Sequence, residues 1–277
     1  MTDEQREQLL DNWDSASGGW ARQAERTREW LAPLSNWMLD KSELAPGVRV
    51  VELAAGPGDL SLLAAPRVAP TKVLCSDAVE SMVDAARERA KEHGVENVEF
   101  GRLQLEWIDL PAASVDVIMC RFGLMFAVDP AAALRECRRV LAPGGRLVLG
   151  VWDVPGVNAA FSLLRDAAAA LELLGETEGP GAFALSEPGL LRRLHEEAGF
   201  LELDVAEVAV PERYESVVDW IGTVVDRSAS FGAMWRQLDD MQRAQVREEI
   251  RRRAEPYLQS DGSVAAPMRA LASVATV

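Results

Sequence analysis

The amino-acid sequence predicts an α/β protein built on a doubly wound, mostly parallel sheet. Over the first 150 residues, apolar runs of strand length alternate with segments of helical periodicity, and the connections between them are short. The run at 115–120 is apolar at most positions, which is typical of a strand covered on both faces. Parallel strands of this kind are joined by right-handed crossovers, and ligands bind at their carboxyl ends.

Helical periodicity begins near the N-terminus, at residues 3–40, where the small residues at 15–19 interrupt it. Further along, Asp129 and Pro130 form a favoured helix cap and first helical position, while Pro66 and Gly94 end the helices before them. The predicted strands of this half are 48–53, 72–76, 98–103, 115–120 and 146–151, and the helices between them are 58–65, 79–93 and 129–141.

The second half of the chain is richer in helical segments. Neither an internal repeat nor a low-complexity linker separates it from the first half. We therefore expect it to complete the same sheet and to add helical inserts. The predicted helices are 158–174, 186–198, 216–228 and 233–257, and the predicted strands are 202–210 and 264–276.

The charge of the chain limits its partners. A formal net charge of −15 opposes binding to the phosphates of nucleic acid, so a small-molecule partner is expected. No apolar run is long enough to span a membrane, and the polar N-terminus is unlike a signal peptide. Cys75, Cys120 and Cys137 are odd in number and lack metal-ligand spacing, so we expect reduced thiols in a cytoplasmic protein and no metal site. We also expect a monomer or a homodimer.

The segment VVELAAGPGD, at 50–59, predicts a strand, a tight loop and the start of a helix. Gly56 and Gly58 let the backbone approach a ligand closely, and the N-terminus of the helix attracts an anionic group. Asp77, at the end of the second strand, can accept hydrogen bonds from both hydroxyls of a ribose. Ala54 stands where such loops often have a glycine, and this replacement costs little conformational free energy if the φ of Ala54 stays negative. Together these residues predict an adenosine-containing cofactor.

The spacing of the glycines does not by itself name the cofactor. Gly56-x-Gly58-x-x-Ser61 is one residue short of the dinucleotide pattern, so NAD remains possible at this point.

Four motifs in order carry a resemblance to a known family: VVELAAGPG, VLCSDAVESMVDAARERA, LPAASVDVIMCRFGLMF and LRECRRVLAPGGRLVLGVWD. They resemble the class I S-adenosylmethionine-dependent methyltransferases, in the branch of the ubiquinone/menaquinone C-methyltransferases. The resemblance implies a Rossmann-like seven-stranded sheet whose last strand is antiparallel and lies beside the sixth. It divides the chain into an N-terminal helical lid segment (1–44), a cofactor-binding core (45–153) and a remainder (154–277) with a helical substrate cap between strands six and seven.

The resemblance also assigns roles to residues of this chain. Asp77 would hold the ribose hydroxyls, and Gln104 stands where relatives have an acidic residue that reaches the adenine amino group. Arg121 stands where relatives have a small polar residue, so its guanidinium is expected to point away from the sulfonium or to bind an anion. The implied cofactor-binding set is Trp20, Glu52, Ala54, Gly56, Gly58, Asp77, Ala78, Met82, Gln104, Leu105, Cys120 and Arg121.

Methyl transfer from a sulfonium requires mainly alignment of donor and acceptor and exclusion of water. A general base is needed only where the acceptor loses a proton, and the weak candidates are His195, Tyr214 and Arg121. The candidate residues of an apolar acceptor pocket are Trp13, Phe122, Met125, Phe126, Trp220 and Trp235.

The resulting hypothesis is a methyltransferase of secondary metabolism that uses S-adenosyl-L-methionine and acts on oxygen or carbon of a hydrophobic or aromatic metabolite. An alternative is an NAD-dependent oxidoreductase. It would need a nicotinamide pocket and a residue that handles hydride, and the sequence indicates neither. A third alternative is a relative that binds the cofactor without catalysing transfer, because Gln104 and Arg121 depart from the family pattern. A methyltransferase of nucleic acid or protein is disfavoured by the charge.

Overall fold

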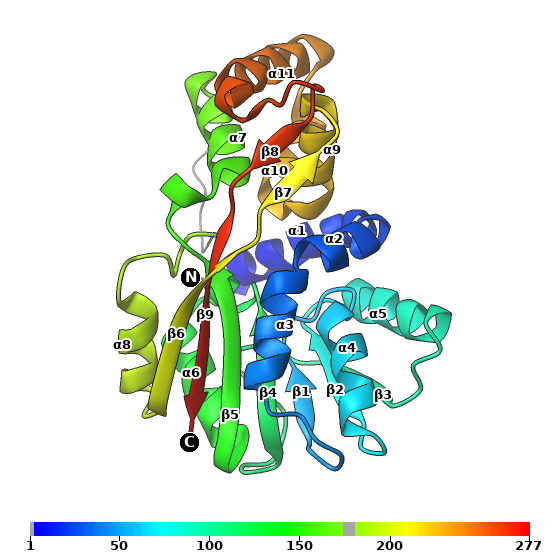
Figure 1. Cartoon of the computed structure of the whole chain (residues 1–277), viewed down its shortest axis with the longest axis vertical. Helices are drawn as coiled ribbons and strands as arrows, with labels where there is room; N and C mark the ends of the chain where they lie inside the picture. Colours follow the sequence, from blue (N-terminus) through cyan, green and yellow to red (C-terminus); the bar gives the residue numbers. More distant parts are fainter. Residues whose placement is uncertain (1–2, 174–180) are drawn as a thin grey trace.

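The computed structural model describes residues 3–173 and 181–277, and its centre is a seven-stranded sheet (Figure 1). The strand order is β3-β2-β1-β4-β5-β9-β6. The last strand runs antiparallel to both of its neighbours, so the predicted fold class is confirmed. The strands are β1 (Val50–Glu52), β2 (Val73–Asp77), β3 (Val98–Arg102), β4 (Val115–Arg121), β5 (Leu141–Trp152), β6 (Leu201–Ala209) and β9 (Arg269–Thr276).

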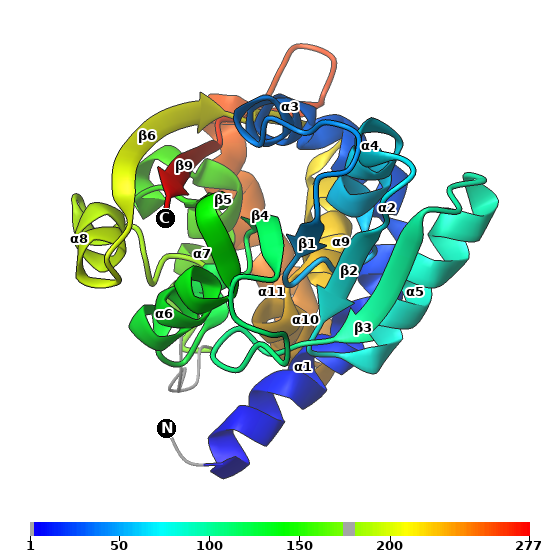
Figure 2. The same ribbon diagram turned by 90° about the horizontal axis from the view of Figure 1, so that it is seen from below.

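Helices cover both faces of the sheet (Figure 2). One face carries α3 (Ala32–Lys41), α4 (Asp59–Val68) and α5 (Glu80–Glu92), and the other carries α6 (Pro130–Val140) and α8 (Leu190–Glu197). All three residues of β1 are buried, as double coverage requires. The predicted cap of α6 is present, since the Asp129 side chain accepts a hydrogen bond from the backbone N–H of Ala132.

A second lobe, which we call the cap, lies beyond the carboxyl ends of the parallel strands (Figure 1). It contains α7 (Ala159–Ala170), β7 (Glu212–Tyr214), α9 (Val217–Arg227), α10 (Ala229–Gln237), α11 (Asp240–Ala254) and β8 (Val264–Ala266). The N-terminal helices α1 (Asp3–Arg22) and α2 (Ala24–Trp30) lie between the cap and the sheet. Short 3-10 turns occupy Leu124–Phe126, Pro155–Val157 and Glu255–Tyr257.

The N-terminal helix does not break where the sequence predicts. Residues 15–19 are helical, and the breaks fall at Gln23 and Leu31 instead. A side chain at Gly19 would collide with the backbone carbonyl of Asp226 in α9, so this glycine serves the close approach of two helices. Tertiary contact therefore stabilises helix at residues that are poor helix formers.

Three other predicted boundaries are wrong. The helix predicted to end at Pro66 continues to Val68. The helix predicted at 233–257 is two helices, since Ser228 caps α10 and Asp239 caps α11. The strand predicted at 264–276 is also two, because β8 pairs with the unpredicted β7 in the cap while β9 joins the main sheet.

Candidate functional site

The loop after β1 has the conformation of a close-approach loop. Ala54, Gly56 and Gly58 all have positive φ, of +51°, +53° and +76°. The expectation of a negative φ at Ala54 is therefore wrong, and the alanine carries a cost of about 1–2 kcal/mol for the left-handed conformation. A Cβ on Gly123 would collide with the Ala54 methyl group, so the glycine after β4 gives that alanine its space.

The two glycines of the loop differ in what surrounds them. A Cβ at Gly58 would lie 2.8 Å from Cβ of Ala86 and 3.2 Å from Sγ of Cys75, so this glycine permits the contact between α4 and α5. A Cβ at Gly56 would meet no atom within 4 Å among the described residues. The backbone at Gly56 therefore faces open space, which is what a loop that receives a ligand requires.

Asp77 ties this loop to the end of β2. Its Oδ2 accepts a hydrogen bond from the Gly56 N–H at 2.9 Å, and its Oδ1 accepts one from the Val79 N–H at 3.0 Å. Burial raises the pKa of the Asp77 carboxyl, and these backbone bonds oppose that shift. Each oxygen keeps a further lone pair, so the carboxylate can still accept from a ligand.

Glu52 is committed to the first turn of α4. Its Oε2 accepts hydrogen bonds from the Ser61 N–H at 2.7 Å and from the Ser61 hydroxyl at 2.5 Å. Burial of the side chain raises the pKa of Glu52 to about 7, against the opposing effect of the Ser61 bonds. Glu52 was expected to bind the cofactor, but its buried carboxyl group instead holds the first turn of α4 beside the loop after β1.

Arg121 turns toward α3 and α4. Its Nη2 donates to Oδ2 of Asp59 at 3.0 Å, and its Nη1 donates to the Ser35 hydroxyl at 2.5 Å. Both members of the ion pair are buried. The guanidinium therefore binds an anionic group, one of the two arrangements expected for it.

Asp59 stands at the centre of a charged cluster that sequence reasoning missed. Besides Arg121, the guanidinium groups of Arg28 and Arg89 lie 3.9 Å from its Oδ1. Arg89 also donates to the Pro57 carbonyl at 2.9 Å, directly at the loop. The signal in the sequence was the acidic residue that follows Gly58, but its arginine partners come from α2, α5 and β4 and share no local pattern.

The N-terminal helix reaches the other end of the candidate site. Arg6 of α1 donates to Oε1 of Gln104 at 3.2 Å, and the Ser81 hydroxyl at the start of α5 donates to Asp14 at 2.7 Å. Gln104 and Leu105 are half-buried beyond β3. The amide oxygen proposed as an adenine contact therefore has a protein partner in this structure.

The remaining expected cofactor contacts differ in exposure. Met82 and Cys120 are buried, whereas Ala78 and Trp20 are half-buried. The indole Nε1 of Trp20 is buried and has no acceptor within the part of the chain that the structure describes. An unsatisfied donor of this kind is unusual in a folded protein.

Aromatic side chains gather after β4 and β5. Phe122 stacks on Trp152 at 3.8 Å between ring centroids, and Trp152 stacks in turn on Trp30 at 5.7 Å. Phe161 meets Trp152 edge-on. Phe122 has a φ of +60°, a strained conformation for a bulky residue, and its N–H donates to the Gly150 carbonyl at 2.7 Å. Only Phe122 of this group was expected from the sequence.

The other expected pocket residues fall into two sets. Trp13 of α1 packs edge-on against Phe126 at 4.8 Å, so the helix and the turn after β4 meet there, with Met125 buried beside it.

The second set lies inside the cap. Trp220 is fully buried there and stacks on Tyr214. Trp235 is half-buried and stacks on Phe231, also within the cap.

The three candidate bases are all engaged in structural contacts. His195 is buried between α8 and the sheet, with its Nδ1 2.7 Å from the Leu191 carbonyl and its Nε2 3.4 Å from the Ser273 hydroxyl. Burial lowers the pKa of His195. Tyr214 donates to Oε2 of Glu212 at 2.7 Å, and burial raises the pKa of the phenol well above its ordinary value. Arg121 is paired with Asp59.

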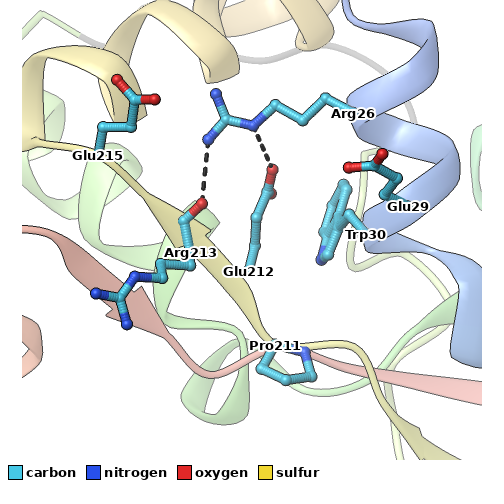
Figure 3. A pocket seen from close by; sticks show the side chains of 7 residues that line it. All are labelled: Arg26, Glu29, Trp30, Pro211, Glu212, Arg213 and Glu215. Carbon is cyan, nitrogen blue, oxygen red and sulfur yellow. Dashed lines mark hydrogen bonds and ion pairs between the residues drawn. The ribbon is translucent and has the colours of Figure 1, made fainter.

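A cavity of about 380 Å³ opens at the junction of α2 and β7 (Figure 3). Its lining residues are Arg26, Glu29, Trp30, Pro211, Glu212, Arg213 and Glu215. Arg26 crosses it and donates to the Arg213 carbonyl at 3.2 Å, with its Nε 3.5 Å from Glu212. The charges of this cavity are mixed.

The described residues contain neither a candidate metal-ligand cluster nor a helix that could span a membrane. Across residues 3–173 and 181–277, no cluster of three or more histidine, cysteine, aspartate or glutamate side chains could hold a metal ion. In the same ranges, no helix combines the length and apolarity needed to cross a membrane.

Comparison with known proteins finds relatives for part of this chain. Residues 50–145 match the family model described as a methyltransferase domain. The ubiquinone/menaquinone biosynthesis C-methyltransferase UbiE of Hahella chejuensis is 37% identical over 119 residues, which are 42% of this chain and 48% of that protein. UbiE of Escherichia coli O1:K1 / APEC is 39% identical over 42% of this chain and 47% of its own. The chain thus spans about half the length of these curated relatives.

Solved structures share the fold at lower identity. The YcgJ protein from Bacillus subtilis has a TM-score of 0.59 and 22% identity, covering 87% of this chain and 97% of its own. A methyltransferase-like protein from Bacillus halodurans C-125 has a TM-score of 0.60 and 19% identity over the same shares. The [4+2]-cyclase SpnF has a TM-score of 0.56 and 19% identity, over 88% of this chain and 79% of that one. Residues 50–145 therefore match a methyltransferase domain, and the chain around them shares the fold of these solved structures.

Proposed function

We propose that the chain is an enzyme that transfers a methyl group from S-adenosyl-L-methionine to a hydrophobic or aromatic small molecule. The observation that carries the proposal is the loop after β1, which Asp77 holds through the Gly56 N–H while the backbone at Gly56 faces open space. The unsatisfied Nε1 of Trp20 adds a buried donor that a ligand could satisfy. These features fit an adenosine-containing cofactor.

Within this proposal, Asp77 would receive the ribose hydroxyls on its remaining lone pairs, and Gly56 and Gly58 would line the methionine portion. When bound, the cofactor supplies a methyl group already activated by a sulfonium. Ala54 and Gly123 shape the strand ends, and the bond of Arg121 to Asp59 directs its guanidinium toward the start of α4. Glu52 and the Asp59 cluster fix the start of α4 beneath the loop.

The protein's part in the reaction is alignment and exclusion of water. The aromatic side chains Phe122, Phe126 and Trp13 offer half-buried apolar surface beside the strand ends, which suits a flat apolar acceptor. None of the three candidate bases is free to take a proton, because each is tied to another group. Transfer by proximity alone is therefore the mechanism we favour, on oxygen or carbon.

The charge and the cysteines support the remaining parts of the proposal. A net charge of −15 favours a small-molecule acceptor over nucleic acid. Cys75, Cys120 and Cys137 are buried free thiols, which accords with a reducing cytoplasm.

Calorimetric titration with S-adenosylhomocysteine tests cofactor binding. We expect binding by the wild type, and we expect Asp77→Ala to weaken it by roughly 1–3 kcal/mol, because hydrogen-bonding groups are left unpaired. Since Asp77 also orders the loop, thermal unfolding of the variant is measured alongside. Asp129→Ala removes a cap carboxylate outside the loop and should leave the affinity unchanged.

Two outcomes would contradict the proposal. Binding of NAD in place of S-adenosylhomocysteine would identify an oxidoreductase. Cofactor binding without a methylated product, in a mass-spectrometric screen of aromatic and apolar acceptors, would identify a non-catalytic relative.

A further inference from the structure

The Arg227 side chain is buried at the junction of the cap and the core, with two of its three guanidinium nitrogens unused. Its Nη1 lies 2.8 Å and 3.1 Å from the two carboxylate oxygens of Glu212. Its Nε and Nη2 are buried and have no acceptor within the described part of the chain. In arginine these two N–H groups share one edge of the guanidinium and point in parallel, in the geometry that matches a carboxylate.

The surroundings hold this edge in place. The guanidinium carbon lies 4.8 Å from the centre of the Trp30 ring, so the planar group rests on an indole face. Glu212 is itself fixed by the Tyr214 hydroxyl at 2.7 Å and lies 3.5 Å from Nε of Arg26. Arg26 is neutralised by Asp219, which it binds through both carboxylate oxygens. Glu212 and the Trp30 ring thus fix the orientation of the Arg227 guanidinium, while its Nε and Nη2 remain without hydrogen-bond partners among the described residues.

The position of Arg227 connects it to the proposed acceptor site. Trp30, on which it rests, stacks on Trp152, and Trp152 stacks on Phe122 directly after β4. Arg227 contacts Trp30 and Glu212 but is not among the residues that line the junction cavity. Its free edge is buried and is not part of that opening.

We propose that Arg227 is a specificity-determining residue that binds a carboxylate on the methyl acceptor, at the end remote from the methylated atom. The inference rests on the proposed function, since it assumes that the acceptor lies along the aromatic stack toward β4. The acceptor is then a molecule with an apolar, ring-bearing portion near Phe122 and an anionic pair of oxygens at Arg227. Sequence patterns give no hint of this, because Arg227 is simply the last residue of α9.

The test uses the full chain saturated with S-adenosylhomocysteine, and benzoate and benzamide as a matched pair of probes. The Nε–H resonances of the arginines are followed by NMR. One resonance should be absent in Arg227→Lys, which retains the positive charge beside Glu212 but loses the parallel donors. Arg247→Lys is the matched control, because Arg247 also lies over a tryptophan ring, that of Trp235, at 5.4 Å.

We expect benzoate, and not benzamide, to move the Arg227 resonance downfield. We expect Arg227→Lys to weaken benzoate binding roughly tenfold and Arg247→Lys to leave it unchanged, because charge-assisted bidentate pairs are the stronger ones. Retained affinity for S-adenosylhomocysteine in Arg227→Lys shows that the variant is folded.

The inference is overturned if the resonance is unmoved by benzoate or moves equally with benzamide while S-adenosylhomocysteine binds normally. Arg227 would then serve only the contact with Trp30 and Glu212. If S-adenosylhomocysteine itself does not bind the wild type, the proposed function fails, and the two failures are thereby distinguished.

Discussion

At the scale of single residues, the candidate site depends on backbone conformations that few side chains tolerate. Ala54 and Phe122 both adopt positive φ, and both lie at the carboxyl ends of central strands. Such strain persists only where the surroundings over-determine it, and it concentrates at functional sites. Here the Gly150 carbonyl fixes Phe122, and Gly123 makes room for Ala54.

The two loop glycines provide a prediction at this scale. Gly58→Ala should destabilise the protein by about 2–4 kcal/mol, since it combines a left-handed backbone with overpacking against Ala86 and Cys75. Gly56→Ala should cost only about 1–2 kcal/mol, because it carries the backbone penalty without a steric clash. Urea unfolding of both variants measures the difference. Equal losses would show that the contact between α4 and α5 is looser than the structure indicates.

At the scale of elements, N-cap side chains determine where the helices of the cap lobe begin. Asp239 and Gln242 form a reciprocal capping box at the start of α11, with hydrogen bonds of 2.8 Å and 3.0 Å. Ser216 and Ser228 cap α9 and α10 through their hydroxyl groups. These short-range bonds explain why a single predicted helix is divided, although its hydrophobic pattern runs on.

The capping box yields a prediction for α11. Asp239→Ala should lower the free energy of unfolding by about 1 kcal/mol, because the N–H of Gln242 loses its acceptor. Asp240→Ala, one residue further and exposed, is the control and should have a smaller effect. Chemical denaturation compares the two. A loss at Asp240 as large as that at Asp239 would argue against the box.

At the scale of the whole molecule, the cap is joined to the core by chain crossings and ion pairs. The Trp30 indole donates to the Val210 carbonyl at 2.7 Å, and Val210 donates to the Met268 carbonyl at 2.9 Å, where two chain segments pass side by side. Arg26 of α2 then binds Asp219 of α9. The N-terminal helices therefore add contacts between the cap and the core to those of the connecting chain segments.

The pH dependence of unfolding reports on the buried Glu52. Its pKa is raised from 4.5 to about 7, chiefly by burial, so the folded state binds the proton more tightly than the unfolded state. The contribution of Glu52 to the free energy of unfolding is complete below about pH 4.5, and it is lost as the pH rises through about 7. Relative to Glu52→Gln, the wild type should therefore lose a few kcal/mol across that interval.

The measurement is the free energy of unfolding of both proteins from acidic to neutral pH. Asp116→Asn is the control with the opposite sign, because hydrogen bonding to Arg49 lowers the pKa of Asp116. A difference between wild type and Glu52→Gln that stays constant with pH would contradict the raised pKa.

The sequence by itself determined the architecture of the core, and it predicted where the site lies. Alternating apolar runs and helical segments predicted the parallel sheet, and the order of four motifs predicted the family, both of which are confirmed. These features are local, because strand burial and helical periodicity are written in neighbouring residues. The role of each predicted site residue, including Asp77, remains a prediction.

Only the tertiary structure decided which side chains meet. The pairing of Arg121 with Asp59, the stack of Phe122, Trp152 and Trp30, and the unused edge of Arg227 join residues far apart in the chain. The positive φ of Ala54 and the helix through Gly19 likewise follow from contacts with Gly123 and α9. Such contacts depend on how the elements pack in space, and no local pattern in the sequence records that.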